Sequence, residues 1–341
     1  MIEINKIHNL DCIEGLKLLE NESIDCCITS PPYYGLRDYQ VKGQIGLEDT
    51  PDLYVEKLVE IFHEIKRVLK KSGNVWLNLG DSYCGGGFGT SKEKDYDLGK
   101  QGTNRGTADY DTRKKLGSLK AHIEGLKTKD LIGIPWMVAF ALRADGWYLR
   151  QDIIWSKNNP MPESVTDRCT KSHEHIFLLS KSANYYFDSE AIAEPIAEST
   201  TDRLAQNNGN MKACRPRYGG KKYTEDTEIF NRTKSGNAYD YRPMRNKRDV
   251  WVVSTKPFKE SHFATFPEEL ITPCVLAGCP QNGIILDPFM GAGTTALVAL
   301  KNKRQYIGFE LNSKYCKLAE KRIEQSRVIW GQIDMSAEVV E

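Results

Sequence analysis

The sequence predicts an α/β fold with a mostly parallel sheet, and two observations support this prediction. Short apolar runs alternate with helix-length amphipathic segments, as they do where crossover helices connect parallel strands. Two of the apolar runs end at turns rich in glycine or proline, which is typical of strand ends beside a ligand site. The 341 residues, 40% of them hydrophobic, suffice for one large domain or for a core with an attachment.

Seven strands and six helices are expected along the chain. The strands are expected near Ile2–His8, Ile24–Thr29, Asn74–Leu79, Tyr148–Trp155, His175–Leu179, Gly283–Leu286 and Gln305–Phe309. The helices are expected at about 12–20, 51–71, 130–145, 267–278, 293–303 and 312–327. The second helix has the clearest apolar face, because Leu53, Leu58 and Ile61 recur at helical spacing.

Two stretches interrupt this alternation. Ser82–Lys120 contains a run of glycines and few aliphatic residues, and it is expected to form a mobile loop. Asn184–Asp249 is rich in Asn, Gly, Arg, Lys and Tyr and lacks helical periodicity, so it is interpreted as an inserted recognition region. The predicted organisation is a core in two parts, residues 1–183 and 251–341, separated by an insertion over 184–250.

Composition excludes several classes of protein. No apolar run has membrane-spanning length and the amino terminus lacks a secretory pattern, so a cytoplasmic protein is expected. Nine cysteines without paired knuckles predict no zinc site, and His173 and His175 lack the further ligands that would predict another metal. The net charge is only +1, but residues 201–250 hold twelve Lys and Arg against six Asp and Glu.

A glycine turn lies near the carboxyl end of the chain, at Asp287-Pro-Phe289-Met-Gly291-Ala-Gly293-Thr294-Thr295. Gly291 and Gly293 would let the backbone approach a ligand closely, and a helix starting near Thr294 would offer free N–H groups to an anion. Glu310 ends the next strand about 20 residues later, where a ribose ligand is expected. A plain tight turn and a helix-capping role for Glu310 are the alternatives.

A second motif follows the apolar run Ile24–Thr29, which stops at Ser30-Pro31-Pro32-Tyr33-Tyr34-Gly35. Two consecutive prolines prevent the strand from continuing and stiffen the backbone. A stiff loop at a strand's carboxyl end, with a polar residue before it and an aromatic one after it, suits a flat ring beside hydrogen-bond acceptors. A proline-rich turn with an exposed tyrosine is the plain alternative.

Together the two motifs resemble those of the amino-group DNA methyltransferases, which act on cytosine N4 or adenine N6. Ser30–Tyr33 resembles their catalytic loop and Asp287–Gly293 their cofactor loop, in the order of the circularly permuted β group. The likeness leaves out the two irregular stretches but extends through Gly73–Asp81, Asp152–Pro160, Ser172–His175 and His262–Pro267. It implies a Rossmann-like methyltransferase fold with a seven-stranded sheet, in which the strand from Gln305 lies between those from Gly283 and Ile2.

The resemblance implies S-adenosyl-L-methionine as the cofactor. Asp11 would contact its adenine amino group, Glu310 its ribose and the Phe289–Gly293 loop its methionine portion. Simpler roles remain open for Asp11, as a helix cap, and for His262, as a hydrogen-bonded loop residue. The expected cofactor-binding residues are Asp11, Cys12, His262, Asp287, Phe289, Gly291, Gly293, Thr294, Thr295, Glu310 and Asn312.

The expected catalytic residues are Ser30, Pro31, Pro32 and Tyr33. An exocyclic amine is a poor nucleophile because its lone pair is delocalised into the ring. If the Ser30 oxygen and the Pro31 carbonyl accept its two hydrogens, the lone pair can be directed at the donated methyl group. The base must first flip out of the duplex, which costs a few kcal/mol, and stacking on Tyr33 offsets this by about 1–3 kcal/mol.

Double-stranded DNA is the partner that these motifs imply, with contacts from the basic stretch between residues 201 and 250. A solvated surface loop is the alternative interpretation of that stretch. The candidate DNA-binding residues are Arg215, Arg217, Arg242, Arg245 and Arg248.

The identity of residue 30 favours cytosine N4 as the target. Relatives acting on adenine usually have aspartate or asparagine where this chain has Ser30, and serine is commoner among those acting on cytosine. The alternatives are adenine N6, methylation of RNA or protein, and a nucleic-acid-binding module without activity. The sequence leaves open the recognition site, a companion restriction endonuclease and a homodimeric state.

Overall fold

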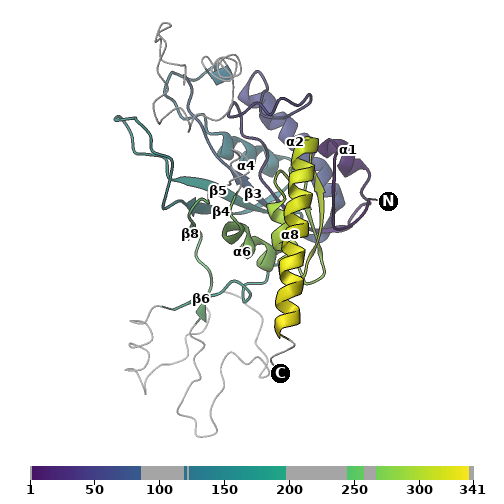
Figure 1. Ribbon diagram of the computed structural model, residues 1–341. Coiled ribbons are helices and arrows are strands. Elements are labelled where there is room, and N and C mark those ends of the chain that lie inside the picture. The colour runs from purple at the N-terminus through teal and green to yellow at the C-terminus, as the bar shows by residue number, and fades with distance from the viewer. Residues whose placement is uncertain (1, 86–118, 121–122, 197–243, 257–265, 338–341) are drawn as a thin grey trace, which may run out of the picture. The chain divides into compact units, whose positions relative to one another are not determined.

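The computed structural model describes residues 2–85, 119–120, 123–196, 244–256 and 266–337 (Figure 1). The chain divides into two compact units, one formed by Met1–Asp188 with Asp249–Glu341 and the other by Ser189–Arg248. The predicted insertion over 184–250 has nearly the same bounds as the second unit. Most of the loop expected over Ser82–Lys120 lies outside the described residues.

The first unit is built on an eight-stranded sheet with the order β1-β10-β9-β2-β3-β5-β4-β8. Neighbouring strands are parallel, except that β5 runs antiparallel to both β3 and β4. The strands are β1 (Lys6–His8), β2 (Ile24–Thr29), β3 (Leu69–Leu79), β4 (Tyr148–Ser156), β5 (His173–Ser180), β8 (Val250–Val252), β9 (Ile284–Asp287) and β10 (Gln305–Phe309).

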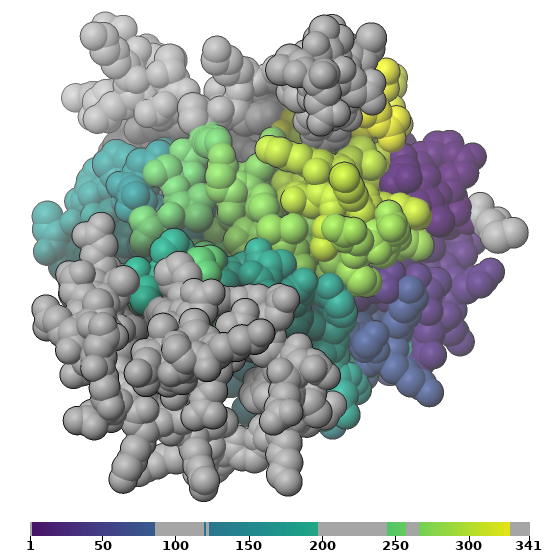
Figure 2. Space-filling model, turned by 90° about the horizontal axis from the view of Figure 1, so that it is seen from below, coloured from purple at the N-terminus to yellow at the C-terminus, as the bar shows by residue number. Residues whose placement is uncertain are grey.

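All seven predicted strands are present, and β8 is an eighth. The insertion was expected to extend to residue 250, but Val250 already begins β8, which pairs with β4 at the edge of the sheet. The strand β10 lies between β1 and β9, as the family resemblance implies. Figure 2 accordingly shows amino-terminal residues in purple beside carboxyl-terminal residues in yellow.

The helices of the described residues lie in two layers, one on each face of the sheet (Figure 1). Residues alternate between the two faces: Cys27 and Val75 point into the core under the first three helices, whereas Gly278 on the other side contacts Cys26 and Trp76. The helices of the first layer are α1 (Cys12–Lys17), α2 (Pro51–Val68) and α4 (Ile134–Ala144), and those of the second are α6 (Glu268–Gly278), α7 (Thr294–Lys301) and α8 (Ser313–Ala337).

Several element boundaries differ from those expected, for local reasons. The helix α2 ends at Val68 and not near 71, because Leu69 is extended and pairs with Ile24 to begin β3. The helix α4 begins only at Ile134, after Gly133 adopts a φ of 86°. The first strand is shorter than expected, and α8 extends ten residues beyond the predicted end at 327.

The second unit contains a small antiparallel pair of strands, β6 (Glu194–Pro195) and β7 (Met244–Arg245). The ends of this unit are all that the structure describes of the basic stretch and its surroundings. Among the described helices of the chain, none is both long and apolar enough to span a membrane.

Candidate active site

A cavity of about 460 Å³ lies at the edge of the sheet where β2, β3, β4, β9 and β10 end. Because β5 is antiparallel, the amino end of that strand reaches the same edge. Residues from all these strand ends line the cavity. The predicted site residues that line it are Asp11, Cys12, Ser30, Pro31, Pro32, Tyr33, Phe289, Gly291, Thr294, Glu310 and Asn312.

One half of the cavity is bounded by the glycine turn between β9 and α7. Gly291 has a φ of 52° and Gly293 a φ of 80°, conformations that residues with side chains rarely adopt. A Cβ on Gly293 would lie 2.8 Å from the Cβ of Ala319. The backbone and packing therefore both require glycine at position 293, which holds the loop close to α8.

Glu310 is fixed beside this turn by two backbone donors. The amide N–H groups of Gly291 and Asn312 each donate to one of its carboxylate oxygens, over 2.8 Å. Burial raises the pKa of Glu310, although these hydrogen bonds oppose the shift. The result is an oriented acceptor group at a strand tip, whose chemistry suits the paired hydroxyls of a ribose.

Asp287, which was expected to bind the cofactor, is buried beneath the turn and does not line the cavity. Its carboxylate accepts hydrogen bonds from the hydroxyls of Thr29 (2.7 Å) and Thr295 (2.6 Å) and from the N–H of Phe289 (3.1 Å). Burial raises the pKa of Asp287 to about 6. Thr295 and Gly293 are likewise absent from the cavity wall, so these three residues hold the turn in shape.

Asp11 has the capping role that the sequence left open, and it also borders the cavity. It caps α1, since one of its carboxylate oxygens accepts from the N–H groups of Ile13 (2.9 Å) and Glu14 (3.3 Å). It also lines the cavity together with Cys12, the first residue of α1. Burial raises the pKa of Cys12 to about 12, so this thiol stays neutral at ordinary pH.

The Ser30–Tyr33 loop follows β2 directly, and all four of its residues line the cavity. The hydroxyl of Tyr54 donates to the Pro32 carbonyl over 2.9 Å and so fixes the loop from below. Gly80 borders the Tyr33 ring so closely that a Cβ there would lie 2.5 Å from the ring carbon Cε2. Both contacts restrict the loop to one conformation.

The Tyr33 hydroxyl is tied into a polar network. Its single O–H has two acceptors within reach, Glu174 Oε2 at 2.7 Å and Asn78 Oδ1 at 3.1 Å. Its pKa is well above the ordinary value, because the group is buried and the Glu174 carboxylate is close, while a hydrogen bond from the Ser30 side chain acts in the opposite direction. Tyr33 is therefore a neutral donor, and its ring is held at both its edge and its hydroxyl.

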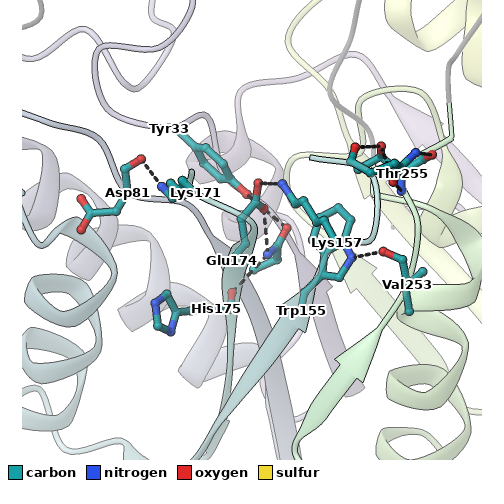
Figure 3. Close-up of polar contacts among 11 residues, drawn as sticks. Tyr33, Asp81, Trp155, Lys157, Lys171, Glu174, His175, Val253 and Thr255 are labelled. Atoms are coloured by element: carbon teal, nitrogen blue, oxygen red, sulfur yellow. Dashed lines mark hydrogen bonds and ion pairs between the residues drawn. The ribbon is translucent and has the colours of Figure 1, made fainter. Parts of the chain in front are cut away.

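The other half of the cavity contains residues to which the sequence analysis gave no role: Asn78 and three residues labelled in Figure 3, Trp155, Lys157 and Glu174. Each lies at or beside the end of a predicted strand, and that position was the available signal. Their association could not be predicted, because it depends on β5 entering the sheet between β3 and β4. In that register Trp155 lies opposite Glu174.

The remaining predicted residues lie elsewhere. His262, Arg215, Arg217 and Arg242 are outside the described residues. Arg245 and Arg248 belong to the second unit, where both lie within 4 Å of the Glu194 carboxylate. In the parts of the chain that the structure describes, no three His, Cys, Asp or Glu side chains are grouped as metal ligands would be.

Comparison with solved structures identifies the fold. The cytosine-N4-specific PvuII DNA methyltransferase matches with a TM-score of 0.58 and 16% identity, over 98% of this chain and 93% of that one. The Thermus thermophilus protein TTHA0409, solved with S-adenosyl-L-methionine, matches with a TM-score of 0.54 and 18% identity, over 94% and 95% of the two chains. These structures share the methyltransferase fold with this protein.

Sequence comparison identifies the family. A family model described as DNA methylase, for N6 and N4 methyltransferases, matches residues 24–321. The Type II methyltransferase M.SmaI of Serratia marcescens is 42% identical over 93% of this chain and 90% of its own length. M.Cfr9I of Citrobacter freundii is 41% identical over 92% and 86%. The chain therefore belongs to the N6/N4 family of S-adenosyl-L-methionine-dependent DNA methyltransferases.

Proposed function

We propose that this protein is a Type II methyltransferase that modifies the exocyclic N4 of a cytosine flipped out of double-stranded DNA. The main observation in support is that the Ser30–Tyr33 loop shares one cavity with the Gly291 turn and Glu310. An amine held by the loop would thus face the group held by the turn. Two sequence relatives are Type II methyltransferases, and one structural relative is cytosine-N4-specific.

The half of the cavity beside the turn fits S-adenosyl-L-methionine, which supplies an electrophilic methyl group when it is bound. The positive φ angles of Gly291 and Gly293 shape a turn that residues with side chains rarely adopt, and Gly291 lines the cavity without a side chain. Glu310 offers a fixed acceptor for ribose hydroxyls, and Asp11 offers one for an amino group. Tyr39 and Tyr315 pack edge to face and add an aromatic wall, for which the sequence gave no signal.

In the reaction, we assign the two acceptor positions to the Ser30 hydroxyl and the Pro31 carbonyl. Each would accept one N–H of the amine, so that the nitrogen can pyramidalise and direct its lone pair away from the ring. Tyr33 would stack on the flipped ring, in an orientation fixed by Asn78 and Glu174. No strong base is needed at the start, because the amine proton becomes acidic only when the nitrogen acquires positive charge.

DNA would be held largely through phosphate contacts from the basic stretch between residues 201 and 250. Arg215, Arg217, Arg242, Arg245 and Arg248 are the proposed contacts. The Type II names of the relatives also support a companion restriction endonuclease that cuts the same DNA sequence when it is unmodified.

Product analysis tests the proposal directly. Plasmid DNA from cells expressing the protein would be digested to nucleosides and compared with DNA from cells expressing Ser30→Ala. N4-methylcytosine, present with the wild type and reduced at least about 10-fold with the variant, is expected. N6-methyladenine as the main product would replace the assigned target base, and unmodified DNA would exclude the proposed activity.

A further inference from the structure

A connected set of polar groups occupies the half of the cavity beyond the Ser30–Tyr33 loop (Figure 3). At its centre, the Glu174 carboxylate accepts from Tyr33 Oη (2.7 Å) and from Asn78 Nδ2 (3.3 Å). The same carboxylate forms an ion pair with the ammonium group of Lys157. The side chains of Lys157 and Glu174 are only 17% and 15% exposed, so this is a largely desolvated pair.

The position of the Lys157 ammonium is fixed on two sides. One side is the Glu174 carboxylate, and the other is the Trp155 ring, whose centroid lies 4.4 Å from Lys157 Nζ. The Trp155 ring is itself anchored, since its Nε1–H donates to the Val253 carbonyl over 2.8 Å. An ammonium group has three N–H donors, and the ion pair uses one of them.

Stability alone does not account for such a pair. Burying two charges has a desolvation cost that an apolar pair of similar size avoids, so a buried ion pair is weak support for a purely structural role. Here the pair lies in the wall of a cavity, adjacent to the residue proposed to stack on the target base. A charged donor at that place is positioned to read the edge of a flipped ring.

We infer that Lys157, held by Glu174, donates to the acceptor edge of the flipped cytosine and thereby determines which base is accepted. This inference rests on the proposed function. In cytosine the amine is followed along the ring edge by two acceptors, N3 and O2. In adenine the acceptor N1 is followed by a C2–H, which cannot accept. A donor to the atom next to the amine would suit both bases, so the donor that favours cytosine is one fixed at the position of O2.

Glu174 acts as the positioning residue in this arrangement. It orients Lys157 and the Tyr33 hydroxyl at the same time, so ring stacking and edge recognition share one support. It also offsets the charge of Lys157. A lone ammonium near the ring would oppose the positive charge that develops on the amine during methyl transfer, whereas a neutral pair does so much less.

The test combines protein variants with modified substrates. Nucleoside analysis of DNA treated with wild-type enzyme first identifies the product and its sequence context. Duplexes with that site would then carry, in place of the target cytosine, either 3-deazacytosine, which lacks N3, or a 2-aminopyridine C-nucleoside, which lacks O2. Single-turnover methylation rates and equilibrium DNA affinities would be measured for the wild type, Lys157→Met and Lys157→Arg.

Loss of a hydrogen bond from a charged donor is worth about 10- to 100-fold. With the wild type, the 2-aminopyridine analogue, which lacks O2, should lower the rate or the affinity by that factor beyond the loss it causes with Lys157→Met; a loss confined to 3-deazacytosine would place the donor at N3 and overturn the assigned base discrimination. The intrinsic reactivity of each analogue cancels in this comparison. Lys157→Arg should retain part of the discrimination. Equal losses with wild type and Lys157→Met for the analogue that lacks O2 would overturn the inference but leave the proposed function intact.

Three controls make the result unambiguous. Lys57→Met makes the same change at an exposed Lys–Glu pair on α2, and it should behave as the wild type does. Lys157→Met alone leaves the Glu174 charge buried without its partner. If that variant does not fold, the double variant Lys157→Met with Glu174→Gln, which removes both charges, takes its place in the comparison. If the wild-type product is N6-methyladenine, the proposed function and this inference both fail, because adenine has no second acceptor on that edge.

Discussion

The hydroxyl of Thr29 donates to Oδ1 of Asp287 over 2.7 Å, in the buried part of the sheet between β2 and β9. Thr29 directly precedes the Ser30–Tyr33 loop, and Asp287 directly precedes the glycine turn. One hydrogen bond therefore joins the bases of the two loops that face the cavity. The bond fixes the spacing between the proposed amine site and the proposed methyl-donor site.

Replacing Thr29 with valine removes this donor while nearly preserving the side-chain volume. Asp287 would be left with an unmade hydrogen bond in the core, so the free energy of unfolding should fall by about 1–3 kcal/mol. Chemical denaturation at neutral pH measures this change. Thr29→Ser keeps the hydroxyl and serves as the control, and a loss of the same size in both variants would show that packing, not the hydrogen bond, is responsible.

The buried Asp287 predicts a pH dependence of stability. Its pKa is about 6 in the folded protein, against an ordinary value of 3.8, because of burial. Between these values the folded chain holds a proton that the unfolded chain has released, so stability falls as pH rises through this window. In Asp287→Asn this contribution is absent.

The measurement is the difference in unfolding free energy, wild type minus Asp287→Asn, from about pH 4 to about pH 7. This difference should decrease by about 2 kcal/mol over that range. Using the difference removes the contributions of other titrating groups. A difference that stays constant with pH would mean that the carboxyl group titrates normally.

Gly291→Val should abolish cofactor binding. A β-branched residue at a φ of 52° is strained. If the backbone changes conformation to relieve this strain, the N–H of residue 291 moves away from the Glu310 carboxylate that it orients. Calorimetry should show at least about a 10-fold loss of affinity for S-adenosyl-L-methionine. Gly125→Val introduces the same residue at a φ of 80°, away from the cavity, and should bind normally. If a folded Gly291→Val protein binds S-adenosyl-L-methionine as tightly as the wild type does, the cofactor site lies elsewhere.

Gly80→Ala should impair methyl transfer without weakening cofactor binding. The added Cβ would lie 2.5 Å from Tyr33 Cε2, so the ring must move from its present position. Displacement of the proposed stacking surface should lower kcat by about 10-fold or more. The affinity for S-adenosyl-L-methionine is the internal control. A variant with normal kcat would show that the position of Tyr33 is unimportant for turnover.

Replacing both Arg215 and Arg217 with alanine should weaken DNA binding and reduce its dependence on salt. Each lost phosphate contact should lower the slope of log affinity against log salt by about 1. Fluorescence anisotropy with a DNA duplex at several salt concentrations measures both quantities. Unchanged anisotropy titrations would place the DNA contacts outside this stretch, and cofactor affinity should not change.

The sequence predicted seven strands of the large sheet and the two loops, because each is encoded locally, whereas the shared site of the two loops was implied by the family resemblance. Apolar runs define the strands, consecutive prolines end one, and glycines with positive φ shape the other loop. The contacts between Tyr33, Lys157 and Glu174 are encoded non-locally. They depend on strand order, and neither the apolar pattern of β5 nor its length specifies an antiparallel position between β3 and β4.

Asp287 illustrates a different difficulty. Its place in a glycine-rich motif suggested a ligand contact, but an aspartate beside such a turn can equally face inward. Only the neighbouring hydroxyls of Thr29 and Thr295 decide between these orientations, and Thr29 is distant in sequence. Similarly, β8 has only three residues, so the alternation of its buried and exposed side chains is too short to distinguish a strand from the end of an apolar loop.

The reversed direction of β5 also determines where this protein can vary in length. Since β4 ends and β5 begins at the cavity edge, the whole connection over 157–172 lies on that side of the sheet. Residues inserted there would lengthen the rim over the proposed base site without altering any strand pairing. Changes in target preference can therefore accumulate in this connection while the sheet stays constant.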